Sequence, residues 1–188
     1  MAPREDRRIE VWADWVPLPK PTFVGTLFVR LLQGREVYSF EYDPAWLEHP
    51  LALAIDPGLQ LFAGPQYAAD AELNFGVFLD SSPDRWGRIL MRRREALEAR
   101  EQGRPARTLL ETDYLLGVHD AQRMGGLRFR TEPDGPFLDN RVELVAPPMA
   151  RIHELEFASL KLEEESAEDD PEYAAWLRLL IAPGSSLG

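Results

Sequence analysis

Two aspartates that lie close together in the sequence are the first candidates for chemistry. Asp80 and Asp84 bracket the polar run Ser81-Ser82-Pro83, and a pair of neighbouring carboxylates suits general acid and base catalysis. Both positions also have a structural explanation. Asp80 precedes an expected helix, and Asp84 lies in its first turn, where the helix dipole favours negative charge. We interpret the pair as structural, with catalysis as the alternative.

The residue types and their spacing argue against a metal site, a reactive thiol and a glycine-rich nucleotide loop at residues 125–126. The three histidines, His49, His119 and His153, show neither the short spacing of metal ligands nor an HExxH arrangement, so we predict no metal site. The absence of cysteine excludes disulfides, zinc-thiolate sites and a thiol nucleophile, and agrees with a reducing compartment. Gly125 and Gly126 lack the order of strand, GxGxxG and helix, so we interpret them as a tight turn that allows close packing.

Charge is unevenly distributed along the 188 residues. The net charge of −11 argues against a surface that coats nucleic acid. Residues 85–107 nevertheless carry eight arginines, whereas residues 154–172 carry nine acidic residues and one lysine. We interpret the arginines as a solvated helix surface with intrahelical pairs such as Arg94 with Glu98. The five tryptophans are too scattered for a base-stacking platform, and we expect them to anchor the core.

Strands are expected to fill the N-terminal third of the chain. Residues 8–13, 22–32 and 36–42 are rich in β-branched and aromatic side chains. The short link Gln33-Gly34-Arg35 predicts that the last two strands form an antiparallel hairpin. A further strand is expected at 127–131, after the glycine pair. In the turn before it, we expect Asp120 to cap a following element.

Helices are expected to dominate the rest. Ser82 can cap a helix that has Pro83 at its first position and that runs to about residue 102, where Gly103 and Pro105 stop it. A single turn should follow Asp43, and a helical pattern begins at residue 70. Further helices are expected at 109–116, 149–164 and 171–181, with an acidic linker at 163–170.

The sequence therefore predicts an α+β fold. A core is feasible because 45% of the residues are hydrophobic. The charged N-terminus is unlike a signal peptide and no apolar run is long enough to span a membrane, so we expect a soluble, cytoplasmic protein. The length of 188 residues allows one domain or two small ones.

Three segments, in this order and spacing, resemble the HipA family of serine/threonine kinase toxins from bacterial toxin–antitoxin systems. The first comprises GTLFV at 25–29 and YSFEYDPAWLEHP at 38–50, the second is FGVFLDSSPDRWGRILMRRR at 75–94, and the third is TDYLLGVHDAQRMGGLRFR at 112–130. The resemblance implies two domains, an N-terminal antiparallel β subdomain with helices at residues 1–105, followed at residues 106–188 by the start of a kinase-like N-lobe.

The last residues are similar to the opening of the family's glycine-rich loop. Small residues let backbone N–H groups and hydroxyls approach a phosphate. The resemblance implies a nucleotide-binding role for Gly184, Ser185, Ser186, Leu187 and Gly188, with Ser185 or Ser186 as a possible autophosphorylation position. The alternative is a tail without function. The lysine, base and metal-holding residues of phosphoryl transfer lie beyond these positions in the family. We therefore assign no catalytic or metal-binding residue and expect this chain alone to be inactive.

The resemblance also implies cofactors and partners. The intact family uses ATP and magnesium to phosphorylate protein hydroxyls, and we expect neither to bind tightly to this chain. The expected partners are the remaining kinase core and a HipB-like helix-turn-helix antitoxin, through which contact with nucleic acid would be indirect. A competing hypothesis is a separate interaction module that binds and restrains a cognate kinase or contacts the antitoxin. A third, an unrelated small-molecule enzyme, lacks any supporting group of residues.

Overall fold

The computed structural model describes residues 6–68, 74–120, 123, 125–138, 160–161 and 175–176. The chain divides into two compact units, each described here by itself. The first unit comprises residues Met1–Pro83 and Leu110–Asn140, and the second comprises Asp84–Leu109 and Arg141–Gly188. This division differs from the predicted domain boundary after residue 105, which stays a prediction.

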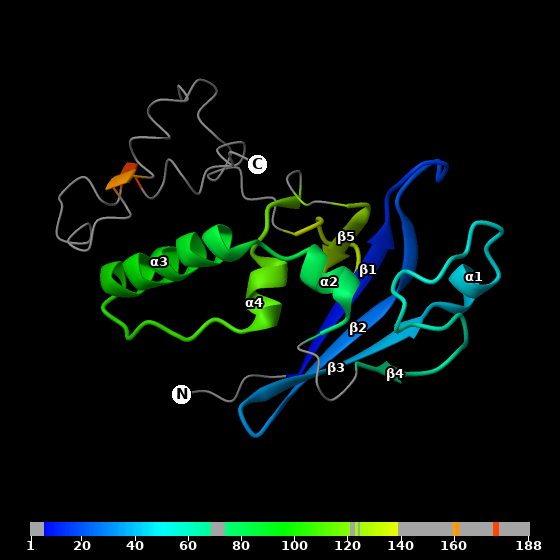
Figure 1. The fold of residues 1–188 in the computed structure, drawn as a ribbon, viewed down its shortest axis with the longest axis horizontal. Helices are drawn as coiled ribbons and strands as arrows, with labels where there is room; N and C mark the ends of the chain where they lie inside the picture. Colours follow the sequence, from blue (N-terminus) through cyan, green and yellow to red (C-terminus); the bar gives the residue numbers. More distant parts are fainter. Residues whose placement is uncertain are drawn as a thin grey trace. The chain divides into compact units, whose positions relative to one another are not determined.

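A five-stranded antiparallel sheet forms the centre of the first unit (Figure 1). Its strands are β1 (Arg7–Ala13), β2 (Thr22–Leu32), β3 (Arg35–Tyr42), β4 (Gln66–Tyr67) and β5 (Leu127–Arg130), in the order β4, β3, β2, β1, β5. Every neighbouring pair is antiparallel. The predicted N-terminal strands and the α+β class are confirmed, whereas the kinase-like N-lobe stays a prediction.

The hairpin between β2 and β3 has the predicted tight link. Leu32 pairs with Arg35, so the loop contains only Gln33 and Gly34. Both loop residues have positive φ angles, of 52° and 82°, as a type I′ turn requires. This turn matches the twist of the flanking strands and sets the register of the sheet.

One glycine lets β2 and β3 come unusually close. A Cβ at Gly25 would lie 2.2 Å from the backbone oxygen of Glu41 and 2.8 Å from Cζ of Phe40. A backbone oxygen in a paired strand cannot move aside cheaply. Gly25 is therefore required for the approach of these strands.

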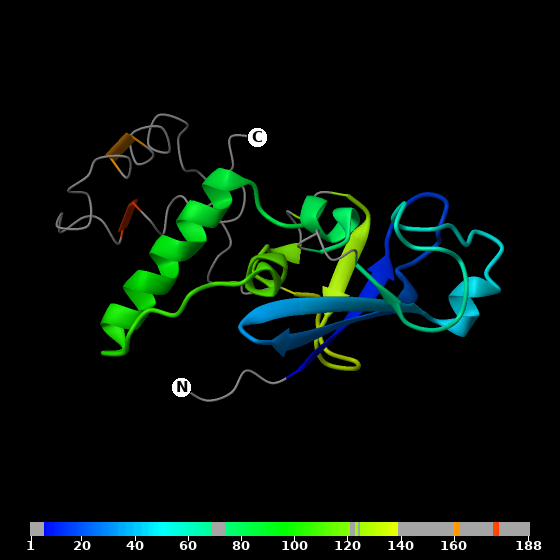
Figure 2. The ribbon, with the colours of Figure 1, turned by 60° about the horizontal axis from the view of Figure 1, so that its bottom comes forward.

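Alternation along the strands builds the core on one face of the sheet. The hydrophobic cluster combines inward residues of the strands with Phe75 and Phe78 of the α2 region and Leu115 of α4. Its strand members include Ile9, Val11, Leu27, Val29, Tyr38, Phe40, Leu127 and Phe129. The helices α2 (Gly76–Asp80) and α4 (Glu111–Leu116) lie on the same side of the sheet (Figure 2).

The short helix α1 (Pro44–Leu47) begins as predicted after Asp43, whose carboxylate accepts the N–H of Ala45 at 2.9 Å. Its buried Trp46 packs edge-on against Trp15, which agrees with the expected anchoring role of the tryptophans. The helix α3 (Arg85–Glu101) is the described helix of the second unit and contains the expected pair of Arg94 and Glu98, 3.8 Å apart.

The prediction for the start of α3 was wrong. Asp84, rather than Ser82, is the N-cap, and its carboxylate accepts the N–H of Gly87 at 2.7 Å. The Ser82 hydroxyl instead donates to the carbonyl of Phe78 at 2.9 Å, so it belongs to the end of α2. Pro83 consequently lies before the helix. The predicted end is confirmed, because Gln102 is the C-cap and Gly103 has a φ of 62°.

The remaining helix predictions have different outcomes. The helix expected at 109–116 is present as α4. The helices expected at 149–164 and 171–181 and the acidic linker fall almost entirely outside the described residues, so they stay predictions. Among the described helices, none combines the length and apolar character needed to cross a membrane.

Candidate functional site

The residues assigned to the phosphate loop, Gly184–Gly188, lie outside the described residues. The described part of the chain contains the aspartate pair. Asp80 is exposed at the end of α2, and Asp84 caps α3. These positions favour the structural interpretation. No group of three or more metal-ligating side chains occurs among the residues that the structure describes.

The buried Arg123 side chain donates hydrogen bonds to four backbone carbonyls of the first unit. It is 8% exposed and donates to the carbonyl oxygens of Ser81 at 3.0 Å and Leu115 at 2.8 Å. It also donates to Val118 and Leu138 at 2.9 and 3.2 Å. Ser81 is the C-cap of α2 and Leu115 lies in the last turn of α4, where carbonyls lack intrahelical partners. The guanidinium therefore joins the negative ends of two short helices.

Arg128 holds two carboxylates beside the start of β5. Its guanidinium donates to both oxygens of Asp120 and to Asp14 at 3.2 Å. The hydrogen bond to Asp120 raises the pKa of Arg128 above its ordinary value. Asp120 thus pairs with an arginine across the turn. Whether it also caps a following element stays a prediction, because residues 121 and 122 lie outside the described residues.

An open pocket of about 330 Å³ lies next to this ion pair, with a lining of acidic, basic and glycine residues. Both carboxylates in it already accept hydrogen bonds from Arg128. The glycine pair forms the predicted tight turn, since Gly125 has a φ of 84° and a Cβ on Gly126 would lie 2.8 Å from Cε3 of Trp15. The lining residues are Asp14, Asp120, Arg123, Gly125, Gly126, Leu127 and Arg128. This arrangement favours packing and ion pairing over nucleophilic chemistry.

A carboxylate from β3 supplies the missing cap of α4. The residue at the N-cap, Leu110, has no side-chain acceptor. Instead Glu36 accepts the N–H of Thr112 at 3.1 Å and the hydroxyl of Tyr38 at 2.5 Å. The Tyr38 hydroxyl is also 3.1 Å from that of Thr112. Burial, with Glu36 beside it, raises the pKa of Tyr38 above its ordinary value.

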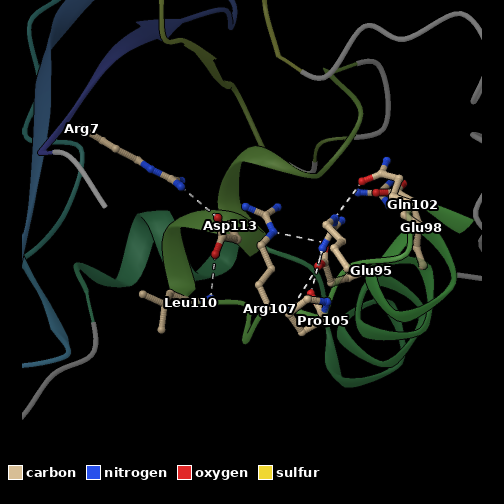
Figure 3. A network of polar contacts seen from close by, with 10 residues as sticks. Arg7, Glu95, Glu98, Gln102, Pro105, Arg107, Leu110 and Asp113 are labelled. Atoms are coloured by element: carbon tan, nitrogen blue, oxygen red, sulfur yellow. Dashed lines mark hydrogen bonds and ion pairs between the residues drawn. The ribbon is translucent and has the colours of Figure 1, made fainter. Parts of the chain in front are cut away.

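A second carboxylate ties α4 to β1. Asp113 accepts the N–H of Leu110 at 2.9 Å through one oxygen and Arg7 at 3.1 Å through the other (Figure 3). The Asp113 side chain is 6% exposed. The start of β1 therefore contributes to positioning this helix.

In the second unit, a buried carboxylate binds the segment that follows α3, residues 102–107, which we call the arm (Figure 3). Glu95 is 5% exposed and accepts hydrogen bonds from Arg104 at 2.5 Å, from the N–H of Arg107 at 3.0 Å and from its guanidinium at 3.2 Å. The Arg104 hydrogen bond is the main cause that lowers the pKa of Glu95 to about 2. Two of the eight arginines thus serve to fold the arm back onto the helix.

An aromatic and cationic layer covers the sheet face opposite the core. Arg128 and Arg130 alternate with buried residues on β5, and both lie over the ring of Phe137, at 3.9 and 4.1 Å. Arg130 also lies 4.5 Å from the ring of Trp12. We call Trp12, Phe137 and Arg130 the cation–π layer.

Sequence reasoning missed the roles of Arg123, Glu36 and Arg130. The alternation of leucine, arginine, phenylalanine and arginine on β5 was a usable signal for the cation–π layer, since period 2 places both arginines on one face. Leu110, at the N-cap of α4, has no side chain that can accept a hydrogen bond, which indicated that another residue must supply the acceptor. The sequence did not show that this residue is Glu36. For Arg123 the sequence offered no signal, because its acceptors are spread from residue 81 to residue 138.

Comparisons with protein-family models, curated proteins and solved structures found no match to this chain.

Proposed function

We propose that this chain is the N-terminal part of a HipA-like serine/threonine protein kinase from a toxin–antitoxin system, acting in the cytoplasm. In this proposal the described residues position the kinase core and bind partners, while phosphoryl transfer from ATP with magnesium belongs to a core that follows. The five loop residues Gly184–Gly188 would begin the phosphate site. The 188 residues alone would be inactive.

One observation carries the proposal: the three segments that resemble the family contribute to a single core. Leu27 and Phe40 come from the first segment, Phe78 from the second, and Leu115 and Phe129 from the third, and all five are fully buried. The ring of Phe78 lies 5.8 Å from that of Phe40 and 6.1 Å from that of Phe129. Segments inherited together as one subdomain are expected to pack in this way.

Reading the gene beyond the codon for Gly188 tests this proposal. We expect the frame to continue through further glycine to a lysine within a few residues. A calorimetric titration of the 188-residue chain with Mg-ATP should give no micromolar binding, because the lysine that holds the phosphates would be missing. An immediate stop codon, or micromolar binding of Mg-ATP, would contradict the proposal.

The second candidate is a separate interaction module that restrains a cognate kinase or contacts a HipB-like antitoxin. The described residues favour it in one respect. Their prominent polar side chains, including Arg123, Glu36 and Glu95, bond within their own unit and serve packing. A stop codon after Gly188, together with binding of the purified chain to such a kinase or antitoxin at tens of micromolar or below, would support the module.

A further inference from the structure

Arg130 and its neighbour Arg128 on β5 differ in their ion pairs. Arg128 is neutralised by Asp120 and Asp14. The side chain of Arg130 makes no hydrogen bond or ion pair with any described residue, and its buried Nε has no acceptor. Glu10, directly opposite Arg130 in the register of β1 and β5, instead accepts the indole N–H of Trp12 at 3.2 Å.

The two rings beside Arg130 orient its guanidinium without satisfying its donors. The guanidinium carbon lies 4.1 Å from the centre of Phe137 and 4.5 Å from that of Trp12, and these rings meet edge to face with centres 5.9 Å apart. Cation–π contacts fix the position of the charge. The five N–H donors of a guanidinium still require acceptors. Arg130 is only partly buried, so an acceptor from outside the chain can reach it.

A carboxylate on an apolar stem suits this surface better than a polyanion. A guanidinium binds a carboxylate through two parallel hydrogen bonds, while aromatic rings at its side can cover the stem. A nucleic acid would bring many phosphates close to Glu10, Asp14 and Asp120, in a chain whose net charge is −11. Those charges repel a polyanion.

We propose that the cation–π layer is a docking site for a mainly apolar peptide segment of a partner protein that carries a single carboxylate, which binds Arg130 while its apolar neighbours pack on Trp12 and Phe137. The site does not depend on the chain being part of a kinase. Its failure and that of the kinase proposal are therefore distinguishable.

Nuclear magnetic resonance on the ¹⁵N-labelled 188-residue chain tests the site directly. The probe is a short peptide with one glutamate between leucines and with blocked ends, and its glutamine counterpart is the control. The signals followed are the Nε–H of Arg130 and the indole N–H of Trp12. We expect both to shift and saturate with the glutamate peptide, and neither to saturate with the glutamine peptide.

Two matched variants distinguish binding at this site from a general effect of positive charge on the surface. Arg130→Met keeps an apolar stem and should weaken peptide binding about tenfold or more, as expected for loss of a charge-assisted pair. Arg30→Met removes the same charge from an exposed arginine on β2, 3.6 Å from Asp6, and should change binding by less than about twofold. The set of indole signals reports that each variant is folded.

Three results would overturn the proposal. The first is the absence of saturable shifts with the glutamate peptide. The second is equal binding by the two variants. The third is a short oligothymidylate that binds more tightly than the peptide and loses that binding in Arg130→Met, because this would assign the layer to nucleic acid.

Discussion

Replacement of Arg123 by methionine should cost the first unit much of its stability. The side chain of methionine is apolar and fills similar space, but it donates no hydrogen bonds. Four carbonyl oxygens would lose their donor, including those at the ends of α2 and α4. We expect the free energy of unfolding to fall while the fold is retained at low temperature.

The contacts set the size of this loss. The bonds to Ser81 and Leu115 are buried, whereas those to Val118 and Leu138 are partly buried, so water can replace the second pair. A hydrogen bond from a charged donor contributes about 1.5 to 3 kcal/mol. Counting only the two buried bonds gives a loss of about 3 to 6 kcal/mol, a large share of the ~5 to 15 kcal/mol typical of domains.

Urea unfolding followed by tryptophan fluorescence measures this loss. Arg123→Lys should lose about half as much, because an ammonium keeps the charge and three donors but lacks the planar fork. Arg30→Met, at an exposed position, should change the free energy by less than about 0.5 kcal/mol. A loss below about 1 kcal/mol for Arg123→Met would refute the reasoning that Arg123 joins the two helices.

Further predictions follow from single sites. The Glu95 carboxyl should titrate near pH 2 by ¹³C resonance, against its ordinary 4.5, and its contribution to stability should be full above pH 4.5 and lost as the pH falls towards 2. Hydrogen exchange of the Arg107 amide should quicken over that window, and an ordinary titration near 4.5 would contradict the network. Gly25→Ala should destabilise the first unit by about 3 kcal/mol in urea unfolding, since its Cβ would lie 2.2 Å from the oxygen of Glu41; a change below about 1 kcal/mol would show that the strands separate easily. In a spectrophotometric alkaline titration, Tyr38 should stay protonated where ordinary tyrosines ionise, at about pH 10, and a simultaneous titration of all five tyrosines in the folded protein would oppose its burial.

The local features of the fold could be predicted from the sequence. β-Branched and aromatic residues marked β2 at its observed bounds, Thr22–Leu32. The Gln33-Gly34 turn followed from the preference of type I′ turns for residues that tolerate positive φ. The stop of α3 followed from Gly103. In each case the physical cause acts within a few residues, so the sequence contains it.

Features set by distant partners could not be predicted in this way. Ser82 and Asp84 are both suitable N-caps, and the choice was decided by the hydrogen bond from Ser82 back to Phe78. The ion pair of Asp120 with Arg128 on β5 likewise depends on a residue beyond its own turn. The position of β5 beside β1 depends on tertiary pairing between segments more than a hundred residues apart.

The candidate site divides in the same way. The cation–π layer was accessible in part, because alternation on β5 places Arg128 and Arg130 together. The pairing of β1 with β5, which brings Trp12 to these arginines, could not be predicted. The loop residues Gly184–Gly188 lie outside the described residues, so their assignment to a phosphate site stays a prediction that rests on the resemblance.

Transfer of labelled phosphate is the most direct test of the proposed function. The protein encoded by the full reading frame would be purified and incubated with magnesium and ATP labelled at the γ-phosphate, beside the 188-residue chain and a variant lacking the first lysine after the glycine-rich loop. We predict incorporation of label into serine for the full protein alone. Absence of label in the full protein, or equal label in the lysine variant, would contradict the assignment of this chain to a HipA-like kinase.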